Sequence, residues 1–138
     1  KTLPGSTTAN GFLNATSPEL AKLRTCMDAK LKGSATLTST TDNNIARGKC
    51  DPLAPDERFK DKANNCSHRQ GSCHYGGTNP VCQKKGSYAL DYVGDNGKIA
   101  EAARACDSNA FVLREGAGTT NDHTHISLGA KYGCGCDD

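Results

Sequence analysis

Hydrophobic positions at helical spacing mark the first ordered element of the chain. They recur every three or four residues, at Leu20, Leu23, Met27 and Leu31. This pattern predicts a helix over residues 18–32. Ser17 is a good N-cap before the helix, Pro18 suits its first turn, and Gly33 is placed to end it.

Four later segments favour strands, because they are apolar or rich in β-branched residues and in part alternate in polarity. They cover residues 35–40, 88–93, 110–114 and 123–128. A second helix is predicted over residues 97–107. Its apolar residues share one face: Ile99, Ala102, Ala103 and Cys106. The order of elements predicts a small α+β domain in which two main helices pack on a mixed or antiparallel sheet.

The cysteines concentrate where the apolar pattern breaks. Residues 42–86 are rich in charged and turn-forming residues and contain four of the eight cysteines of the chain. A dense, even set of cysteines indicates disulfides, and a structural zinc site is disfavoured because no C-x2-C pair occurs. We therefore expect up to four disulfides to organise a long cysteine-rich loop region. Cys134 and Cys136, one residue apart, should pair with different partners.

Length and cysteine content together suggest one domain from an oxidising compartment. A chain of 138 residues fits a single domain, which we place at residues 17–138, after a flexible arm over residues 1–16. The expected location is secreted, either extracellular or periplasmic. The first residues do not resemble a signal peptide, so we interpret the chain as a mature or trimmed ectodomain. Sequons at Asn14 and Asn65 are compatible with a eukaryotic secretory route.

Charge and hydropathy narrow the possible partners. The net charge is +2, from 17 basic and 15 acidic side chains, and no basic run occurs, which argues against nucleic acid. No stretch of about 18 residues is apolar enough to span a membrane. Hydrophobic residues make up 35% of the chain, so we expect a thin core that disulfides must supplement. We also expect a monomer.

Histidines supply the candidate chemistry. His123 and His125 lie on one predicted strand, where alternation directs both imidazoles to the same face and lets them share a metal or a substrate. His74 precedes a Tyr-Gly-Gly turn, and Asp91 ends an apolar run in which an ionised carboxylate needs a partner such as a cation. Each of these residues also has a structural interpretation. His123 and His125 would lie on a solvated strand face, His74 would hold a turn, and Asp91 would accept backbone N–H bonds at a strand end.

In their order and flanking residues, these positions resemble the superfamily of D-Ala-D-Ala peptidases, phage L-alanyl-D-glutamate endopeptidases and the hedgehog signalling domain. In that superfamily, a His and an Asp within H-x-x-G-x-A-x-D and the second His of a later H-x-H hold zinc. The corresponding segments here are His74-Tyr75-Gly76-Gly77, Ser87-Tyr88-Ala89-Leu90-Asp91-Tyr92, Phe111-Val112-Leu113-Arg114-Glu115-Gly116 and His123-Thr124-His125-Ile126-Ser127. The last two segments look particularly like the end of the hedgehog domain. The resemblance covers about residues 18–130.

The resemblance implies that zinc is held by His74, Asp91 and His125. Two nitrogens and one carboxylate leave a position for water, which is typical of catalytic zinc. His123 would then line the site and stabilise an oxyanion or orient substrate. The fourth histidine, His68, is expected with its arginine neighbour in a solvated loop, and substrate contact is the alternative.

The resemblance also implies a general base, for which the chain offers Glu115 and Asp122. We favour Glu115, because its context places it at the end of a strand that faces the metal, whereas Asp122 could equally point to solvent. The peptidases of the superfamily hold the substrate carboxylate with an Arg after the first strand. Here Thr40-Thr41-Asp42 takes that place, and Arg47 or Arg69 would substitute.

One loop departs from the superfamily in length. The superfamily places its first His and its Asp closer together than His74 and Asp91, so residues 78–86 and a neighbour form an insertion. Cys73 and Cys82 flank or lie within this insertion and could staple it, which would keep both of its ends near the metal.

Three functions remain as hypotheses. The first, which we favour, is a secreted zinc peptidase that cleaves a peptide cross-link of the bacterial cell wall, at a D,D- or L,D-type bond. The second is a binding or signalling module that keeps the metal without catalysis, as the hedgehog likeness and the missing arginine permit. The third is a disulfide-rich toxin, effector or surface subunit whose histidines are incidental.

Overall fold

A computed structural model describes residues 16–136 of the chain, so nearly all of the arm expected over residues 1–16 lies outside the described residues. The helical elements are α1 (Pro18–Leu31), α2 (Asn43–Ala46), α3 (Asp56–Phe59), the 3-10 turn η1 (Cys73–Tyr75), α4 (Pro80–Lys85) and α5 (Asn96–Cys106). The strands are β1 (Ala35–Ser39), β2 (Ala89–Gly94), β3 (Phe111–Glu115) and β4 (His123–Ser127). The predicted α+β class is confirmed, and the sheet is antiparallel throughout.

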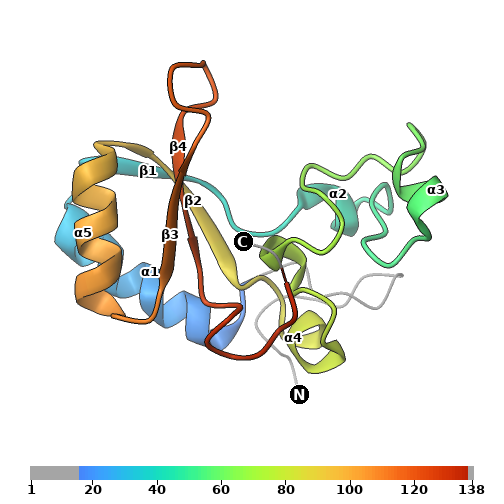
Figure 1. Cartoon of the computed structure of the whole chain (residues 1–138), viewed down its shortest axis with the longest axis horizontal. Helices are drawn as coiled ribbons and strands as arrows, with labels where there is room; N and C mark the ends of the chain where they lie inside the picture. The colour runs from blue at the N-terminus through green and yellow to red at the C-terminus, as the bar shows by residue number, and fades with distance from the viewer. Residues whose placement is uncertain (1–15, 137–138) are drawn as a thin grey trace.

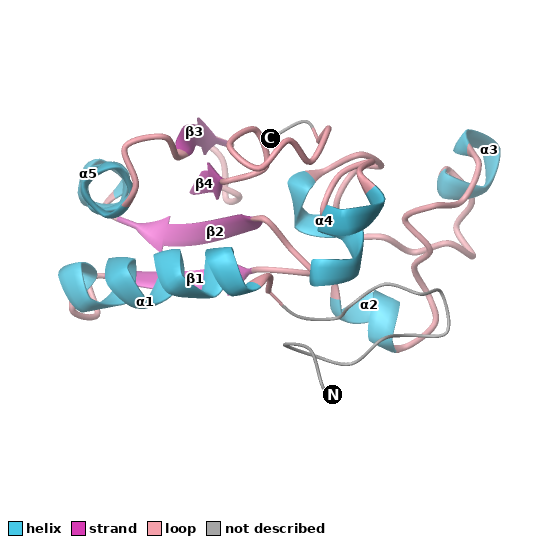
Figure 2. Cartoon of the chain, turned by 90° about the horizontal axis from the view of Figure 1, so that it is seen from below, coloured by secondary structure: helices cyan, strands magenta, loops and turns pink. Residues whose placement is uncertain are grey.

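The four strands form one sheet in the order β1-β2-β4-β3. Helices α1 and α5 contact each other and cover the same side of this sheet; in Figure 1, α5 stands to the left of β3 and β4, and α1 crosses below it and behind the strands. Viewed from below, α1 runs along β1 while α5 is seen end-on (Figure 2). The other face of the sheet is therefore left open for a site.

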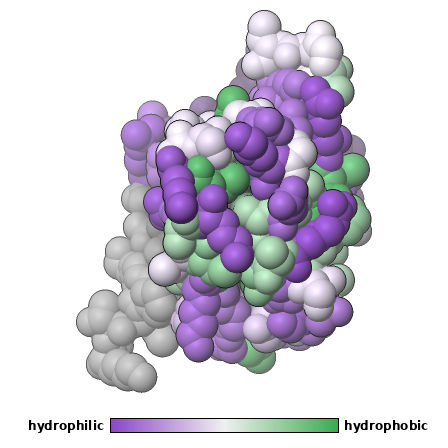
Figure 3. All heavy atoms as spheres, turned by 90° about the vertical axis from the view of Figure 1, so that its left-hand side faces the viewer, coloured by the Kyte–Doolittle hydropathy of each residue, from purple (hydrophilic) through white to green (hydrophobic). Residues whose placement is uncertain are grey.

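The main core lies between these two helices and the sheet. Its largest contributions come from Leu20, Leu23, Met27 and Leu31 of α1, Leu90 and Tyr92 of β2, Ile99 of α5 and Ile126 of β4. The four α1 residues predicted from their spacing are all buried. On the surface at the left-hand side of Figure 1, hydrophilic side chains surround smaller apolar areas (Figure 3).

Both ends of α1 follow from local chemistry. The Ser17 side chain accepts a hydrogen bond from the backbone N–H of Leu20 at 3.2 Å, and Pro18 occupies the first turn, as predicted. The helix stops at Leu31, Lys32 forms a left-handed C-cap with φ of 49°, and Gly33, which was expected to end the helix, follows with φ of 82°.

All eight cysteines form disulfides: Cys26–Cys106, Cys50–Cys66, Cys73–Cys136 and Cys82–Cys134. The expectation that the last two cysteines take different partners is confirmed. The Cys73 to Cys82 staple is wrong, because the C-terminal segment runs beside both residues: the backbone N–H of Asn79 donates to the Cys134 carbonyl at 2.9 Å. Two disulfides therefore fasten η1 and α4 to the end of the chain.

Residues 42–86, hereafter the cysteine-rich region, contain short helices that the sequence pattern did not predict. They have little core of their own beyond an apolar cluster of Ile45, Cys50 and Tyr75. Over residues 16–136, no helix is long and apolar enough to cross a membrane.

Candidate metal centre

Strand register brings four of the predicted site residues together. Asp91 of β2 lies opposite His125 of β4, and Glu115 of β3 lies opposite His123 of β4. Because alternate residues of a strand point to the same face, all four side chains emerge on the open face of the sheet. The residues next to them on β2 and β4, such as Leu90 and Ile126, point into the core instead.

His74 reaches the same place from the cysteine-rich region. It lies in η1, where the Ser72 side chain accepts from the His74 backbone N–H at 3.1 Å and Gly76, with φ of 77°, closes the turn. The backbone N–H of Tyr88 donates to the Cys73 carbonyl at 2.8 Å. This bond fixes η1 beside the segment that leads into β2.

The ring of His74 is oriented toward Asp91. Its Nδ1 is hydrogen-bonded to the Thr40 carbonyl, which can only accept, so the proton lies on Nδ1 and a lone pair is left on Nε2. Nε2 is buried and lies 3.2 Å from Asp91 Oδ2, but it makes no hydrogen bond. A buried nitrogen with an unused lone pair, held by a carbonyl behind it, is the arrangement found in histidines that bind metals.

Asp91 is the common partner of the histidines. Its Oδ1 lies 3.0 Å from His125 Nδ1, while its Oδ2 faces His74. Burial alone would raise the pKa of Asp91, but the neighbouring imidazoles of His125 and His74 outweigh it and hold this pKa well below the usual value. The carboxylate is therefore ionised and available to a cation.

Glu115 and His123 form a second, more accessible pair. Glu115 Oε1 lies 3.1 Å from His123 Nε2 and 3.8 Å from His125 Nδ1. Burial lowers the pKa of His123, but the Asn121 carbonyl, Asp91 and Glu115 together raise it above the ordinary value. His123 therefore gains a proton more readily than a histidine in water.

Of the two candidate bases, Glu115 is the one that faces the imidazoles. Asp122 instead accepts from Arg114, with Nε at 3.0 Å and Nη2 at 2.7 Å, and also from Asn96 at 3.4 Å. Arg114 lowers the pKa of Asp122, so this carboxylate is a poor proton acceptor near neutral pH. Glu115 therefore stays the predicted base.

His68 is part of the site, although we had placed it in a solvated loop. Its ring stacks on that of His74, with centroids 3.7 Å apart and planes 5° from parallel, and its Nε2 lies 2.9 Å from Ser39 Oγ. Burial, followed by the charge of His74, lowers the pKa of His68 to about 4. The fold gathers all four histidines of the chain in one pocket. The small number of histidines was the only feature of the sequence that could have assigned His68 to the site.

The buried carboxylate of Asp42 fixes the loop that carries His68. Asp42 accepts from Tyr75 Oη at 2.8 Å and from the backbone N–H groups of Asn44 and Ser67. Tyr75 Oη in turn accepts from the His68 backbone N–H at 2.8 Å. Asp42 thus has a structural task here.

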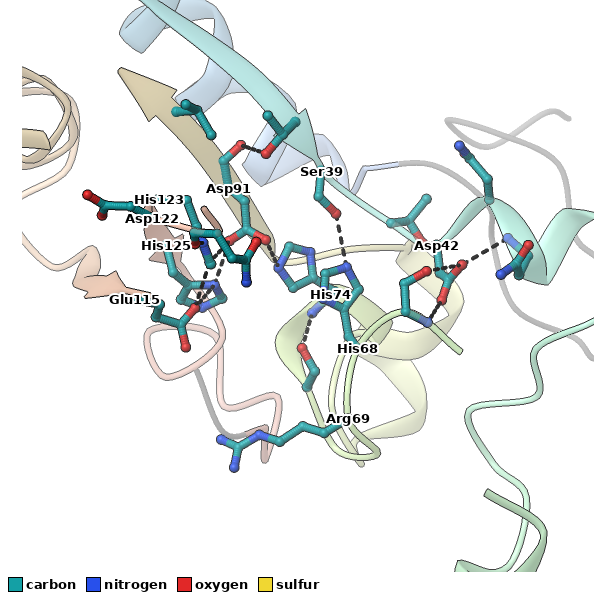
Figure 4. A pocket seen from close by; sticks show the side chains of 18 of the residues that line it. Ser39, Asp42, His68, Arg69, His74, Asp91, Glu115, Asp122, His123 and His125 are labelled. Carbon is teal, nitrogen blue, oxygen red and sulfur yellow. Dashed lines mark hydrogen bonds and ion pairs between the residues drawn. The ribbon is translucent and has the colours of Figure 1, made fainter. Parts of the chain in front are cut away.

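These residues line an open pocket of about 830 Å³ (Figure 4). In this view Asp91, His74, His123, His125 and Glu115 point toward one another, while Asp42 lies apart from them. Arg47 and Arg69, the predicted substrate-binding residues, line the same pocket. The structure therefore brings every predicted site residue to one pocket, although Asp122 is turned to Arg114.

The atoms in this pocket could hold a metal ion in more than one way. Ligand atoms of Asp91, Glu115 and His123 lie within 4.8 Å of one another, and so do those of His68, His74 and Asp91. Imidazole nitrogens mixed with carboxylate oxygens suit zinc and neighbouring divalent metals. Comparison of the chain with protein-family models, curated proteins and solved structures finds no match.

Proposed function

We propose that this chain is a secreted zinc-dependent peptidase that cleaves a peptide cross-link of the bacterial cell wall, at a D,D- or L,D-type bond. One observation carries the proposal: two buried imidazoles converge on the ionised carboxylate of Asp91, with Glu115 and His123 beside them at an open pocket. The resemblance of the sequence to the hedgehog and D-Ala-D-Ala peptidase superfamily suggests the substrate. The four disulfides support an oxidising, extracytoplasmic location.

His74, Asp91 and His125 would hold the zinc ion. The donor set of two nitrogens and one carboxylate fits zinc, and the buried Nε2 of His74 has no other partner. Deep burial of the two histidines, whose side chains are 2% and 4% exposed, supports tight binding. A cation among these groups would also compensate the buried charge of Asp91.

Two neighbouring residues would carry the chemistry. Bound zinc lowers the pKa of its water toward about 7 and polarises a carbonyl. Glu115, at the end of β3, would accept the proton of the attacking water and later pass it to the leaving amine. His123, whose raised pKa favours its charged form, would donate a hydrogen bond from Nε2 to the developing oxyanion.

The rest of the pocket suits a polar peptide. Arg47 and Arg69 lie on its wall and offer positive charge to a substrate carboxylate. The pocket is open to solvent, and its volume of about 830 Å³ is sufficient for several peptide residues.

Metal content is the first test. We expect close to one zinc per chain by elemental analysis of protein purified without a histidine tag. A His125→Ala variant should lose this zinc while keeping its disulfides and circular dichroism spectrum. Absence of zinc from the folded parent protein would overturn the proposal and favour a disulfide-rich protein with incidental histidines.

Hydrolysis of cross-linked muropeptides is the second test. Glu115→Gln should keep the zinc and lower kcat by about 100-fold or more, because it removes the proton acceptor. Asp122→Asn should have a much smaller effect, since that carboxylate is paired with Arg114. The reverse order of effects would make Asp122 the base.

A binding or signalling module that keeps zinc without hydrolysis is the second candidate. The observation that favours it is the structural use of Asp42 at the place of the superfamily's substrate-binding Arg. Zinc-loaded protein that leaves all muropeptides intact would support this alternative.

A further inference from the structure

We propose that the pocket has a second, weaker site for a divalent cation, formed by Asp91, Glu115 and His123, and that a cation bound there inhibits hydrolysis. The inference rests on the proposed function, because it concerns the two groups to which we assign the chemistry. It adds a regulatory position next to the site of His74, Asp91 and His125.

Distances between ligand atoms carry the inference. Glu115 Oε1 and His123 Nε2 are 3.1 Å apart, and His123 Nε2 lies 3.9 Å from Asp91 Oδ1. Ligands of one zinc ion lie about 2.0 to 2.2 Å from the metal. Two ligand atoms of the same ion are therefore separated by distances close to the 3.1 and 3.9 Å found here. The three groups thus need little movement to share one ion.

Asp91 can serve both positions because its two oxygens face different ways. Oδ2 lies 3.2 Å from His74 Nε2, whereas Oδ1 lies between the two histidines of β4, 3.0 Å from His125 Nδ1 and 3.9 Å from His123 Nε2. The second observation that points to cations is the buried His74 Nε2, which has no hydrogen-bond partner and is directed at this carboxylate. A carboxylate between two ions is a common feature of hydrolases with paired metals about 3.5 to 4 Å apart.

The second position should bind more weakly than the first, for two reasons. Two divalent cations a few ångströms apart repel each other. Its ligands are more accessible too, with side-chain exposures of 36% for Glu115 and 14% for His123, so the ion can exchange with solvent.

Inhibition follows from which groups the second ion occupies. A carboxylate bound to a cation is a much weaker proton acceptor, so Glu115 could no longer take the proton of the attacking water. His123 Nε2 would be bound to the ion and could not donate to the oxyanion. Activity should therefore rise as the first zinc binds and fall as the second does.

Zinc binding to the metal-free protein tests the inference without any activity assay. We expect titration calorimetry with zinc chloride to resolve two classes of one ion each, the second at least about tenfold weaker. Glu115→Gln and His123→Ala should each weaken the second class by at least about tenfold and leave the first nearly unchanged. Glu101→Gln is the matched control, because this exposed glutamate lies on α5, across the sheet from the pocket.

The outcomes separate the two proposals. A single class of one zinc in the parent protein would overturn the second site and leave the proposed peptidase standing. A second class that persists in both Glu115→Gln and His123→Ala would also overturn it, because the ion would then bind elsewhere. Absence of both classes from the folded parent would overturn the inference and the proposed function together.

Discussion

Residues 18–39 and 87–128 pack their apolar side chains into one continuous core between two helices and a sheet, whereas the cysteine-rich region buries far less apolar surface of its own. In the cysteine-rich region, disulfides and the hydrogen bonds of Asp42 take the place of a core. Such a region can change its loops freely as long as its cross-links remain.

The candidate metal centre lies where these two kinds of structure meet. Asp91 and His125 stand on the central strands of the sheet, while His74 is held in η1 by the cysteine-rich region. Metal binding at this centre therefore depends on the apolar core and also on the disulfides and hydrogen bonds of the cysteine-rich region. Perturbing the core should affect the site differently from perturbing the cysteine-rich region.

Removal of a disulfide from the cysteine-rich side should have the largest effect. The bond between Cys82 and Cys134 joins residues 52 positions apart. Replacing both cysteines by serine should destabilise the protein by about 4 kcal/mol, because the unfolded chain gains conformational freedom. Urea unfolding gives the free energy, and hydrogen exchange should show faster exchange in η1 and α4 while the sheet stays protected.

The matched control removes the disulfide that links the two main helices. Cys26 and Cys106 are 80 positions apart, so a double serine variant should lose a similar free energy of unfolding. In this variant, however, the faster exchange should appear in α1 and α5. If both double variants opened the same segments, the molecule would be one cooperative unit and the distinction between the two regions would disappear.

A core substitution on the sheet side should have a somewhat smaller effect. Leu20 is 0% exposed in the main core, so Leu20→Ala should lower the free energy of unfolding by about 3 kcal/mol through lost burial and the cavity left behind. Leu53, in the cysteine-rich region, is 59% exposed, and Leu53→Ala should change stability by less than about 0.5 kcal/mol. Thermal or urea unfolding of the two variants checks this contrast, and equal losses would contradict it.

The sheet side was also the part of the fold that the sequence pattern predicted well. Periodic apolar residues located α1 and α5 to within about a residue at each end, because the same residues that form these helices also form the core. In the cysteine-rich region no such periodicity exists. The Cys73 to Cys82 pairing was wrong because the path of the C-terminal segment, which carries both true partners, is a tertiary feature that local spacing does not encode.

In the candidate site, the residues on the sheet followed from the sequence pattern, whereas one residue of the cysteine-rich region did not. Alternation along β4 placed His123 and His125 on one face, and the strand pairing then put Asp91 and Glu115 beside them. His68 was misplaced because it belongs to the cysteine-rich region, where its position depends on a chain of hydrogen bonds through Tyr75. Such a chain involves residues that are distant in sequence and leaves no periodic signal.

The hydrogen bonds of Asp42 provide the smallest and most local test of the comparison. Asp42→Asn keeps the size of the side chain but removes its charge and one acceptor, so we expect a loss of about 2 kcal/mol. Asp56→Asn, at an exposed acid of α3, should cost less than about 0.5 kcal/mol. Hydrogen exchange in the Asp42 variant should increase over residues 66–75, because the loop that stacks His68 on His74 loses its anchor. If the two variants were equally stable, the cysteine-rich region would be held by its disulfides alone, and Asp42 would add nothing to the order of the metal centre.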